Sequence, residues 1–573
     1  MTSNLLTDAT MAGHHGKRKE ISDKESDSMR KVISAAKAAT LIKDGDTIVA
    51  VTFGLAGWAE DVALAVRDRY LAEGHPRGIT FVHAAGVGDW KGRGAGVWAE
   101  EGTEGLVRKV VTSHIGSELQ MAKAVEEEKI ECYFWPLGVM CQWYTEIARR
   151  NPGLLSKTGL GTFIDPRIEG GKVNSISKDN LIKVVKLEGE EWLLYKSFPI
   201  DVTLIRGTTA DEKGNVSFEK EAIALEALPA AMAAKASGGI VIAQVEYLAK
   251  AGTLHPQRVK VPGVCVDYIV VAERPQMQTM STQFNAALAG DVKVPEATIA
   301  SMPFDERKII ARRSAMELAA GPVNLGIGIP QGVAKVVAEE KCSHFMMLIS
   351  ESGNIGGIPG VAGDFGAHSN GEAMLQQDHL FDWFDSGGLA MAFTGLGQTD
   401  KEGNINAGKF GTKPMGVGGF INTTQHTKKV VFCGTFTASG LEIKSGDGTL
   451  TIVKEGKIKK FLKNVEQIAF SGKHAWSVNQ KAVYVTERAV FELTQDGLML
   501  IEIAPGVDLE KDILANMEFK PIISPDLKLM PAGIFRPVWG ELKYELEADH
   551  PTNILLSPVE ASGFQQGRMR MHG

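Results

Sequence analysis

Short apolar runs alternate with amphipathic segments along most of the chain. Thr47 to Thr52 is apolar and β-rich, and after a glycine turn Val62, Ala65, Val66 and Tyr70 recur at helical spacing. This pattern predicts a strand, a turn and a helix. Repeated alternation of this kind is typical of an α/β fold with mostly parallel sheets, in which ligands tend to bind at the carboxyl ends of the strands.

The second half of the chain begins in the same way as the first. Val323 to Leu325 leads into a Gly-rich turn, and Val333, Val336 and Val337 then follow at helical spacing. We therefore expect a second strand, turn and helix at this point.

A more literal repeat links the two halves. Leu204 to Val216 (LIRGTTADEKGNV) aligns with Phe393 to Ile405 (FTGLGQTDKEGNI), with D-x-x-G-N in register. Independent use of the same turn residues is one explanation, because Gly and Asn readily adopt positive φ. Together with the repeated start, however, the match favours two related α/β lobes fused in one chain.

The length of 573 residues supports this division, since it exceeds what one hydrophobic core normally holds. The weak periodicity after Ala272 marks the predicted join. The predicted parts are a flexible polar tail at 1–30, an N-terminal lobe at 31–273, a linker at 274–303, a C-terminal lobe at 304–530 and an extension at 531–573.

Composition narrows the classes of partner. Apolar residues make up 44% and charged residues 23%, as in soluble globular proteins, and the net charge is −7 without long like-charged blocks. Nucleic acid and anionic membranes are therefore not expected as partners. Five cysteines without a C-x-x-C pair argue against a disulfide framework and a zinc site. With no apolar run near the roughly 18 residues of a membrane span, the sequence predicts a soluble, cytoplasmic protein.

The most unusual segment is Leu348 to Gly360 (LISESGNIGGIPG), in which an apolar strand delivers Glu351 into a loop with four glycines. Glycines allow close backbone approach by a substrate and leave N–H groups free to face an anion. A lone Glu in a loop is ordinarily a solvated surface residue. Here three further glycine clusters change that interpretation: Phe53 to Gly57, Gly326 to Pro330 and Met415 to Phe420.

None of these clusters matches the G-x-G-x-x-G dinucleotide fingerprint or the G-x-x-x-x-G-K-[ST] phosphate loop, so NAD and P-loop functions are disfavoured. The ordered motifs VNLGIGIP, SESGNIGG, DxxGNIN and KPMGVGGF instead resemble the C-terminal half of family I CoA-transferases. IVAVTFGLAG, GLGTFIDPRIEGGKVN and LIRGTTADEKGNVSFE resemble the N-terminal half. The likeness covers about residues 31 to 530 and is greatest to single-chain short-chain acyl-CoA:acetate and propionate CoA-transferases.

This resemblance implies a fold of two related open α/β lobes, CoA-transferase or NagB-RpiA-like, and a function. The enzyme would pass coenzyme A from a short-chain acyl-CoA to an acid such as acetate, through a thioester on Glu351. Gly419 would face the reacting acyl group with its N–H. Other expected binding residues are Gly54, Gly57, Asn324, Gly326, Gly328, Gln398, Gly416 and Gly418.

For two residues a structural role is an alternative to a role in the site. Gln398 could be a turn amide that bonds its own backbone, and for His368 we favour a structural role. Coenzyme A is the only carrier expected, with no metal. The resemblance also implies a homotetramer or a dimer. Acetate, propionate, butyrate and acetoacetate all remain possible substrates, because acyl selectivity depends on the volume of the pocket.

The sequence departs from the family pattern at two places. Thr52 replaces a glycine of the opening turn, and Trp58-Ala59 replaces Ile-Pro. Leu137 stands where some members have a glutamine that donates to the oxyanion, so we expect that donor to come from backbone elsewhere.

Two other functions are compatible with parts of the pattern. An acyl-CoA hydrolase would use the same glutamate but admit water as acceptor. A ligand-sensing module of a transcription regulator has a related fold, although the chain has no room for a basic DNA-binding domain.

Overall fold

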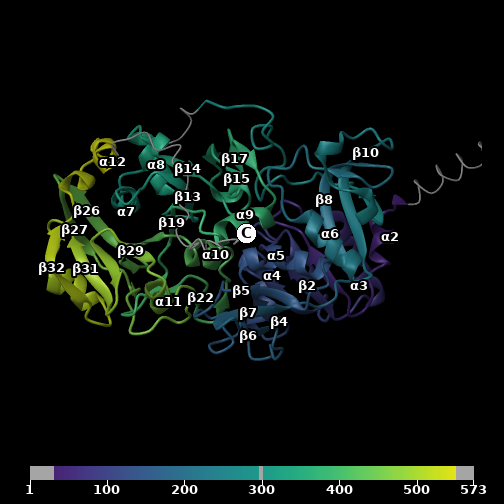
Figure 1. Ribbon diagram of the computed structural model, residues 1–573, viewed down its shortest axis with the longest axis horizontal. Coiled ribbons are helices and arrows are strands. Elements are labelled where there is room, and N and C mark those ends of the chain that lie inside the picture. Colours follow the sequence, from purple (N-terminus) through teal and green to yellow (C-terminus); the bar gives the residue numbers. More distant parts are fainter. Residues whose placement is uncertain (1–30, 296–300, 550–573) are drawn as a thin grey trace, which may run out of the picture.

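Two α/β units lie side by side in the computed structural model, which describes residues 31–295 and 301–549. In Figure 1 the N-terminal unit runs from purple to teal, and the C-terminal unit from teal-green to yellow. The expected tail at 1–30 and the last part of the expected extension, from 550 onward, lie outside the described residues.

The N-terminal unit is built on a nine-stranded sheet. Its path runs β11-β9-β8-β1-β2-β3-β4, and β10 joins both β8 and β12. All pairings except those of β9 are parallel. The strands are β1 (Thr47–Ala50), β2 (Ile79–His83), β3 (Val107–Thr112), β4 (Glu131–Phe134), β8 (Val202–Asp211), β9 (Val216–Ser217), β10 (Ile240–Ala249), β11 (Val259–Val261) and β12 (Tyr268–Val271).

Helices cover this sheet because each presents an apolar face to it. In α3 (Glu60–Glu73), the predicted positions Val62, Val66 and Tyr70 are buried and Ala65 is half-buried. The other helices are α2 (Ala35–Ala39), α4 (Leu119–Glu126), α5 (Leu137–Ala148) and α6 (Ala227–Ala236). A small separate sheet contains β5 (Gly153–Ser156), β6 (Ile182–Leu187) and β7 (Glu190–Lys196).

The C-terminal unit has an eight-stranded sheet in the order β14-β13-β19-β24-β29-β30-β31-β32, parallel except at β30. The strands are β13 (Gly321–Leu325), β14 (Met346–Leu348), β19 (Met391–Gly395), β24 (Lys429–Cys433), β29 (Lys481–Val485), β30 (Ala489–Thr494), β31 (Gly497–Ile503) and β32 (Ile522–Leu529). Its helices are α7 (Glu306–Ala315), α8 (Gly332–Glu339), α9 (Gln377–Asp385), α10 (Phe420–Gln425), α11 (Gly472–Ser477) and α12 (Leu542–Asp549).

The two sheets share one strand order, which confirms the expected pair of related lobes. β2-β1-β8-β10-β12 in the first corresponds to β14-β13-β19-β24-β29 in the second, each in the same chain order. The aligned D-x-x-G-N segments also form the same turn. Asp211 accepts from the N–H and side chain of Asn215, and Asp400 accepts in the same way from Asn404.

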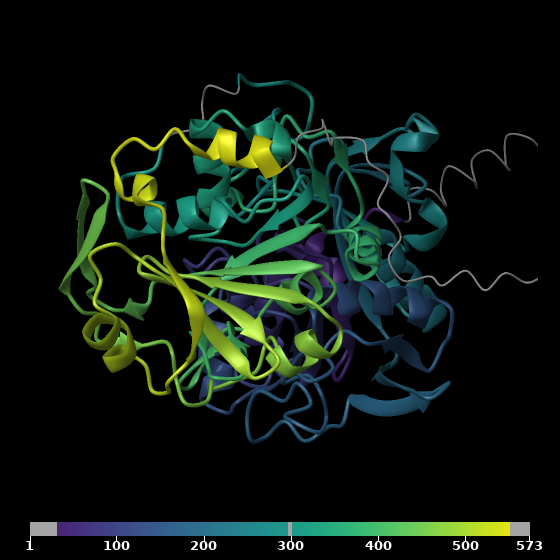
Figure 2. The ribbon, with the colours of Figure 1, turned by 60° about the vertical axis from the view of Figure 1, so that its left-hand side comes forward.

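The second core extends past the expected end of its lobe at 530. Ile534, Phe535, Trp539, Leu542 and Leu546 are buried in it. Figure 2 shows α12 (yellow) beside the teal helices of the same unit. Phe535, Trp539, Leu542 and Leu546 recur at helical spacing, and their packing assigns them to the core of this lobe.

The expected linker also makes ordered contacts. Thr279 and Ser281 donate hydrogen bonds to the Asp364 carboxylate at 2.5 and 2.7 Å, and Leu288 is buried. This segment therefore packs against the C-terminal unit. Among the described residues, no helix is both long and apolar enough to cross a bilayer.

Candidate active site

A cavity of about 500 Å³ lies between the two units, at the carboxyl ends of their parallel strands. Its first wall comes from the N-terminal unit and includes Phe53, Gly54, Gly86 and His114. The second comes from the C-terminal unit and includes Asn324, Gly326, Glu351 and the turn at 415–418. Glu351 and Lys413 are the only Asp, Glu, Lys or Arg residues among those that line the cavity.

Glu351 enters the cavity from a tight turn after β14. The N–H of Ser350 donates to Asn354 O at 2.9 Å, and the N–H of Gly353 donates to Ser350 O at 3.1 Å. The Asn354 side chain fixes the turn to the other unit, since its Nδ2 donates to Ala222 O at 3.0 Å. The turn is thus held from both sides, and the carboxylate has a defined position.

The backbone N–H of Gly419 donates to the Glu351 carboxylate. The approach is so close that a Cβ at position 419 would overlap Glu351 Oε2. Gly419 also precedes α10, whose N-terminal end favours negative charge. A nucleophile and an oxyanion donor expected from sequence therefore lie in direct contact.

Burial raises the pKa of the Glu351 carboxyl to about 7, and the Gly419 hydrogen bond opposes that rise. Only the carboxylate can act as a nucleophile. We expect kcat/KM to rise as pH increases through about 7 and then to level off, and a pH–rate profile with acetyl-CoA would measure this. A profile that is flat between pH 5.5 and 8.5 would contradict it.

The same shift affects stability. The folded protein keeps a proton on Glu351 between the ordinary value of 4.5 and about 7, whereas the unfolded chain loses it near 4.5. The folded state therefore binds more protons in this window, and the stability contributed by this group falls as pH rises through it. The difference in unfolding free energy between wild type and Glu351→Gln, measured across this pH range, isolates the effect from other buried acids.

The turn that contains Gly416 and Gly418 joins the two units. The N–H groups of Val417 and Gly418 donate to Ser113 O at 3.0 and 3.1 Å, and that of Ile115 donates to Met415 O at 3.0 Å. A Cβ at Gly416 would overlap the backbone of Ser113 and His114. We call these contacts between residues 113–115 and 415–418 the seam. Gly419 directly follows it in the chain, so the seam fixes the position of Gly419 relative to the N-terminal wall of the cavity.

The opening turn at Phe53 to Gly57 forms part of the opposite wall. Gly54 and Gly57 have φ angles of 65° and 76°, which disfavour other residues. The N–H of Gly54 donates to Gly86 O at 2.8 Å, and a Cβ at Gly54 would overlap Met280. Gly54 lines the cavity, whereas Gly57 packs against Val51 and Leu225 behind it.

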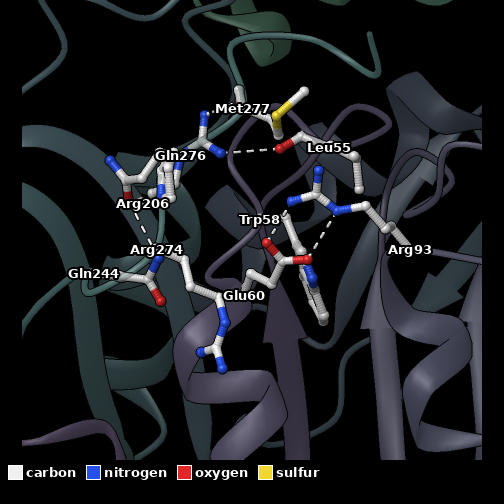
Figure 3. A pocket seen from close by; sticks show the side chains of 10 residues that line it. Leu55, Trp58, Glu60, Arg93, Arg206, Gln244, Arg274, Gln276 and Met277 are labelled. Carbon is white, nitrogen blue, oxygen red and sulfur yellow. Dashed lines mark hydrogen bonds and ion pairs between the residues drawn. The ribbon is translucent and has the colours of Figure 1, made fainter. Parts of the chain in front are cut away.

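A buried arginine anchors this turn from outside the cavity. Figure 3 shows Arg206 donating to Leu55 O, and its Nη1 lies 3.0 Å from that oxygen. Arg206 also pairs with buried Glu221 at 2.6 Å and donates to Met277 O at 2.7 Å. Removing one partner of such a buried pair typically costs about 3–5 kcal/mol, so the anchor is a strong one. Glu60 and Arg93 form a second pair beside it, at 2.6 Å.

The expected binding residues divide into two groups. Gly54, Asn324, Gly326, Gly416 and Gly418 line the cavity with Glu351. Asn324 also supports the nucleophile's strand, because its Nδ2 donates to Ile349 O at 2.9 Å. Gly57, Gly328 and Gln398 are not among the lining residues.

Gln398 takes part in a local network. Its Nε2 donates to Glu466 at 2.5 Å, and its Oε1 accepts from Asn406 at 2.8 Å. Gln398 is therefore used in structural contacts, but its partners are the side chains of Glu466 and of Asn406 in the paired strand, not its own backbone. His368 is buried, and its Nδ1 lies 2.7 Å from Gly356 O, which agrees with a structural role.

The N–H of Leu137, which replaces the family glutamine, is already bonded to Gly418 O at 3.2 Å. Among the described residues, two cavity threonines have hydroxyl groups without a hydrogen-bond partner, Thr394 and Thr423. Sequence reasoning missed them, and also Met280, Phe365 and Lys413. Lys413 stands in KPMGVGGF and Thr394 in the repeat that begins at Phe393, so both were within reach of motif analysis. Met280, Phe365 and Thr423 lie outside the motifs, and their segments meet the cavity only in the folded chain.

Within the described ranges, no group of three or more His, Cys, Asp or Glu side chains is arranged to hold a metal ion.

Comparison with known proteins agrees with this site. Residues 32–272 match the model of the coenzyme A transferase family. The chain is 48% identical to caffeate CoA-transferase of Acetobacterium woodii, covering 90% of this chain and 99% of the relative. It is 41% identical to acetate CoA-transferase YdiF of Escherichia coli K12, covering 88% and 95%.

A solved structure is similar over the same extent. The thioester complex of acyl-CoA transferase YdiF from E. coli O157:H7 with CoA has a TM-score of 0.83 and 39% identity, and the match covers 89% of this chain and 96% of that one. The strand order, the lobes and these relatives agree, and the chain belongs to the family I CoA-transferases, enzymes for which coenzyme A is a substrate.

Proposed function

We propose that this enzyme transfers coenzyme A from a short-chain acyl-CoA to a carboxylic acid by a ping-pong mechanism, with Glu351 as the covalent carrier. The observation that carries the proposal is the contact between the Gly419 N–H and Glu351, which lines the interlobe cavity. A carboxylate held at that position needs no other activation, because orientation can contribute about 7–11 kcal/mol to such a reaction.

In the first half-reaction, a Glu351 oxygen attacks the thioester carbonyl and the C–S bond breaks. The products are a mixed acyl-glutamyl anhydride and CoA thiolate. The thiolate then attacks the Glu351 carbonyl carbon and releases the original acyl group as a carboxylate. An incoming acid reverses these steps, so that no proton or electron is gained or lost overall.

Each attack passes through a tetrahedral oxyanion, and the N–H of Gly419 is a preorganised donor beside the reacting carboxyl. Thr394 and Thr423 also line this cavity, but their hydroxyl groups are buried beneath its surface. The largely apolar wall, which includes Phe53, Phe365 and Phe420, supports transfer over hydrolysis because it excludes water from the anhydride.

We place the nucleotide of coenzyme A outside the rim of the cavity. Lys413 is exposed at that rim, and its ammonium group has no ion-pair partner among the described residues. We assign it to a CoA phosphate. Acetate and propionate are proposed acceptors, and the caffeate relative extends the range to aromatic acids. A cytoplasmic homotetramer or dimer remains a prediction.

The test is an intact-mass measurement after mixing the enzyme with acetyl-CoA and no acceptor acid. We expect a CoA-sized adduct that maps to Glu351 and disappears when acetate is added. CoA release at the same rate with and without an acid would instead identify a hydrolase. Acetyl-CoA binding without any adduct would favour a non-catalytic module and overturn the proposal.

A further inference from the structure

Three helices from the two units meet behind Gly419. α5 belongs to the N-terminal unit, α9 and α10 belong to the C-terminal unit, and Figure 1 shows them together where the units adjoin. The ring of Phe381 on α9 packs against both other helices. A Cβ at Gly138 would lie 2.4 Å from Phe381 Cδ1, and a Cβ at Gly419 would lie 3.2 Å from Phe381 Cζ. The position of Gly419 therefore depends on how these three helices are held together.

One carboxylate bonds the other two helices to α9. Asp385, the last residue of α9, accepts from Asn422 Nδ2 of α10 at 3.0 Å and from Gln142 Nε2 of α5 at 3.1 Å. The buried Asn422 also accepts, through its Oδ1, from the N–H of Gly138 at 3.0 Å. Only this orientation of the Asn422 amide satisfies both partners, because the backbone N–H needs an acceptor and the carboxylate needs a donor.

α10 connects this network to the nucleophile. Gly419 immediately precedes α10, and its carbonyl oxygen accepts from the N–H of Thr423 at 2.9 Å. Asn422 lies in that same first turn, three residues after Gly419. Helical hydrogen bonds fix the backbone of one turn as a unit, so the direction of the Gly419 N–H follows the position of Asn422.

Asp385 has no place in the chemistry proposed above, yet it is held in an unfavourable setting. It is half-buried and lies outside the active-site cavity, in the wall of a second cavity of about 580 Å³. Burial raises the pKa of its carboxyl to about 7, and the hydrogen bonds from Asn422 and Gln142 oppose that rise. A carboxylate at such a position costs free energy unless its oxygens are used, and here they bond two helices.

We propose that Asp385 is a positioning residue, which acts through Asn422 to hold the first turn of α10 so that the Gly419 N–H points at the Glu351 carboxylate. The inference rests on the proposed function, because it assumes that this N–H takes part in the reaction. It adds a residue outside the cavity to the determinants of the catalytic step, and it makes the contact between the units part of the catalytic geometry.

Substitution of Asp385 tests the network at pH 8.5, where Asp385 and Glu351 are both ionised. Asp385→Ala removes the acceptor for Asn422 and leaves the first turn of α10 free to shift. We expect kcat for transfer to acetate, and the rate of CoA-adduct formation with acetyl-CoA alone, each to fall about tenfold. KM for acetyl-CoA should stay unchanged, because only the alignment of the N–H is lost.

Asp382 provides a matched control on the same helix. It is exposed, and the hydrogen bond that it accepts comes from Gln142 at 3.1 Å, so its contact leads to α5 and not to α10. Asp382→Ala removes a carboxylate beside Asp385 without removing the acceptor for Asn422. Its kcat and adduct rate should remain within about twofold of wild type.

A swap of the two side chains separates orientation from general packing. In Asn422→Asp the new carboxylate still accepts from Gly138 but repels Asp385, so the adduct rate should fall at least as far as in Asp385→Ala. In the double variant Asp385→Asn with Asn422→Asp, the amide at position 385 donates to the carboxylate at position 422 and can still accept from Gln142. We expect the adduct rate to return to within about threefold of wild type.

Four results would overturn the inference: an adduct rate in Asp385→Ala within about twofold of wild type, an equal loss in Asp382→Ala, a change confined to KM, or a double variant as slow as Asn422→Asp. Melting temperatures are measured on the same samples. If Asp385→Ala does not fold, the swap decides, because its variants keep polar side chains of native size. Any of these results with a wild-type adduct leaves the proposed function standing, whereas no wild-type adduct overturns that function first.

Discussion

Replacing Glu351 by alanine should abolish the CoA adduct and lower kcat for transfer to acetate by roughly four orders of magnitude or more, as loss of a covalent nucleophile typically does. Water cannot replace the residue, because the carrier must itself hold CoA between the two half-reactions. Mass spectrometry and steady-state kinetics on the purified variant would measure both effects.

Two further variants distinguish charge from position at this residue. Glu351→Gln keeps the shape and loses the nucleophilic oxygen, so it should be as inactive as alanine. Glu351→Asp keeps the charge but withdraws it by one methylene, and a misplacement of about 1 Å costs on the order of 100-fold. Glu372→Ala is the control, since this glutamate is exposed in the neighbouring hairpin. Transfer by Glu351→Ala within tenfold of wild type would show that another group carries CoA.

The second large effect is expected from a single methyl group at Gly419. In Gly419→Ala the new Cβ would overlap Glu351 Oε2, so the carboxylate must move away from the N–H that orients it. We expect kcat to fall by about 100-fold, together with slower formation of the CoA adduct in stopped-flow or quench experiments.

The control for this substitution is Gly446→Ala. Gly446 lies in a strand away from the cavity, and no atom lies within 4 Å of the position of its added Cβ. Equal melting temperatures for the two variants would show that Gly419→Ala acts on the chemistry and not on folding. Activity of Gly419→Ala within about threefold of wild type would mean that this contact is dispensable.

The sequence predicted those parts of the fold that depend on local pattern. Val62, Val66 and Tyr70 form a buried helix face, and the repeated D-x-x-G-N turns mark equivalent strands in the two lobes. Both signals arise from spacing within a few residues. The glycine clusters near Glu351 were also visible in the sequence. At Gly416 and Gly419 other atoms approach the backbone so closely that a side chain would not fit.

What could not be predicted depends on contacts between distant segments. Met280 lies in the expected linker and reaches the cavity only because that segment folds back over Gly54. Gln398 has the composition of a site residue but is used by Asn406 and Glu466. Leu542 and Leu546 join the second core from beyond its expected end. A pattern read along one segment contains none of this information.

The seam at His114 and Gly416 has a consequence for how substrate preference can change. Glu351 and its N–H donor Gly419 belong to the C-terminal half, whereas the facing wall of the cavity, with Phe53, Gly54 and Gly86, belongs to the N-terminal half. Substitutions in the first half can therefore reshape that wall while the reacting groups stay in place. Exchanging the first half between relatives that preserve this seam is a direct route to enzymes with the same catalytic step and different acids.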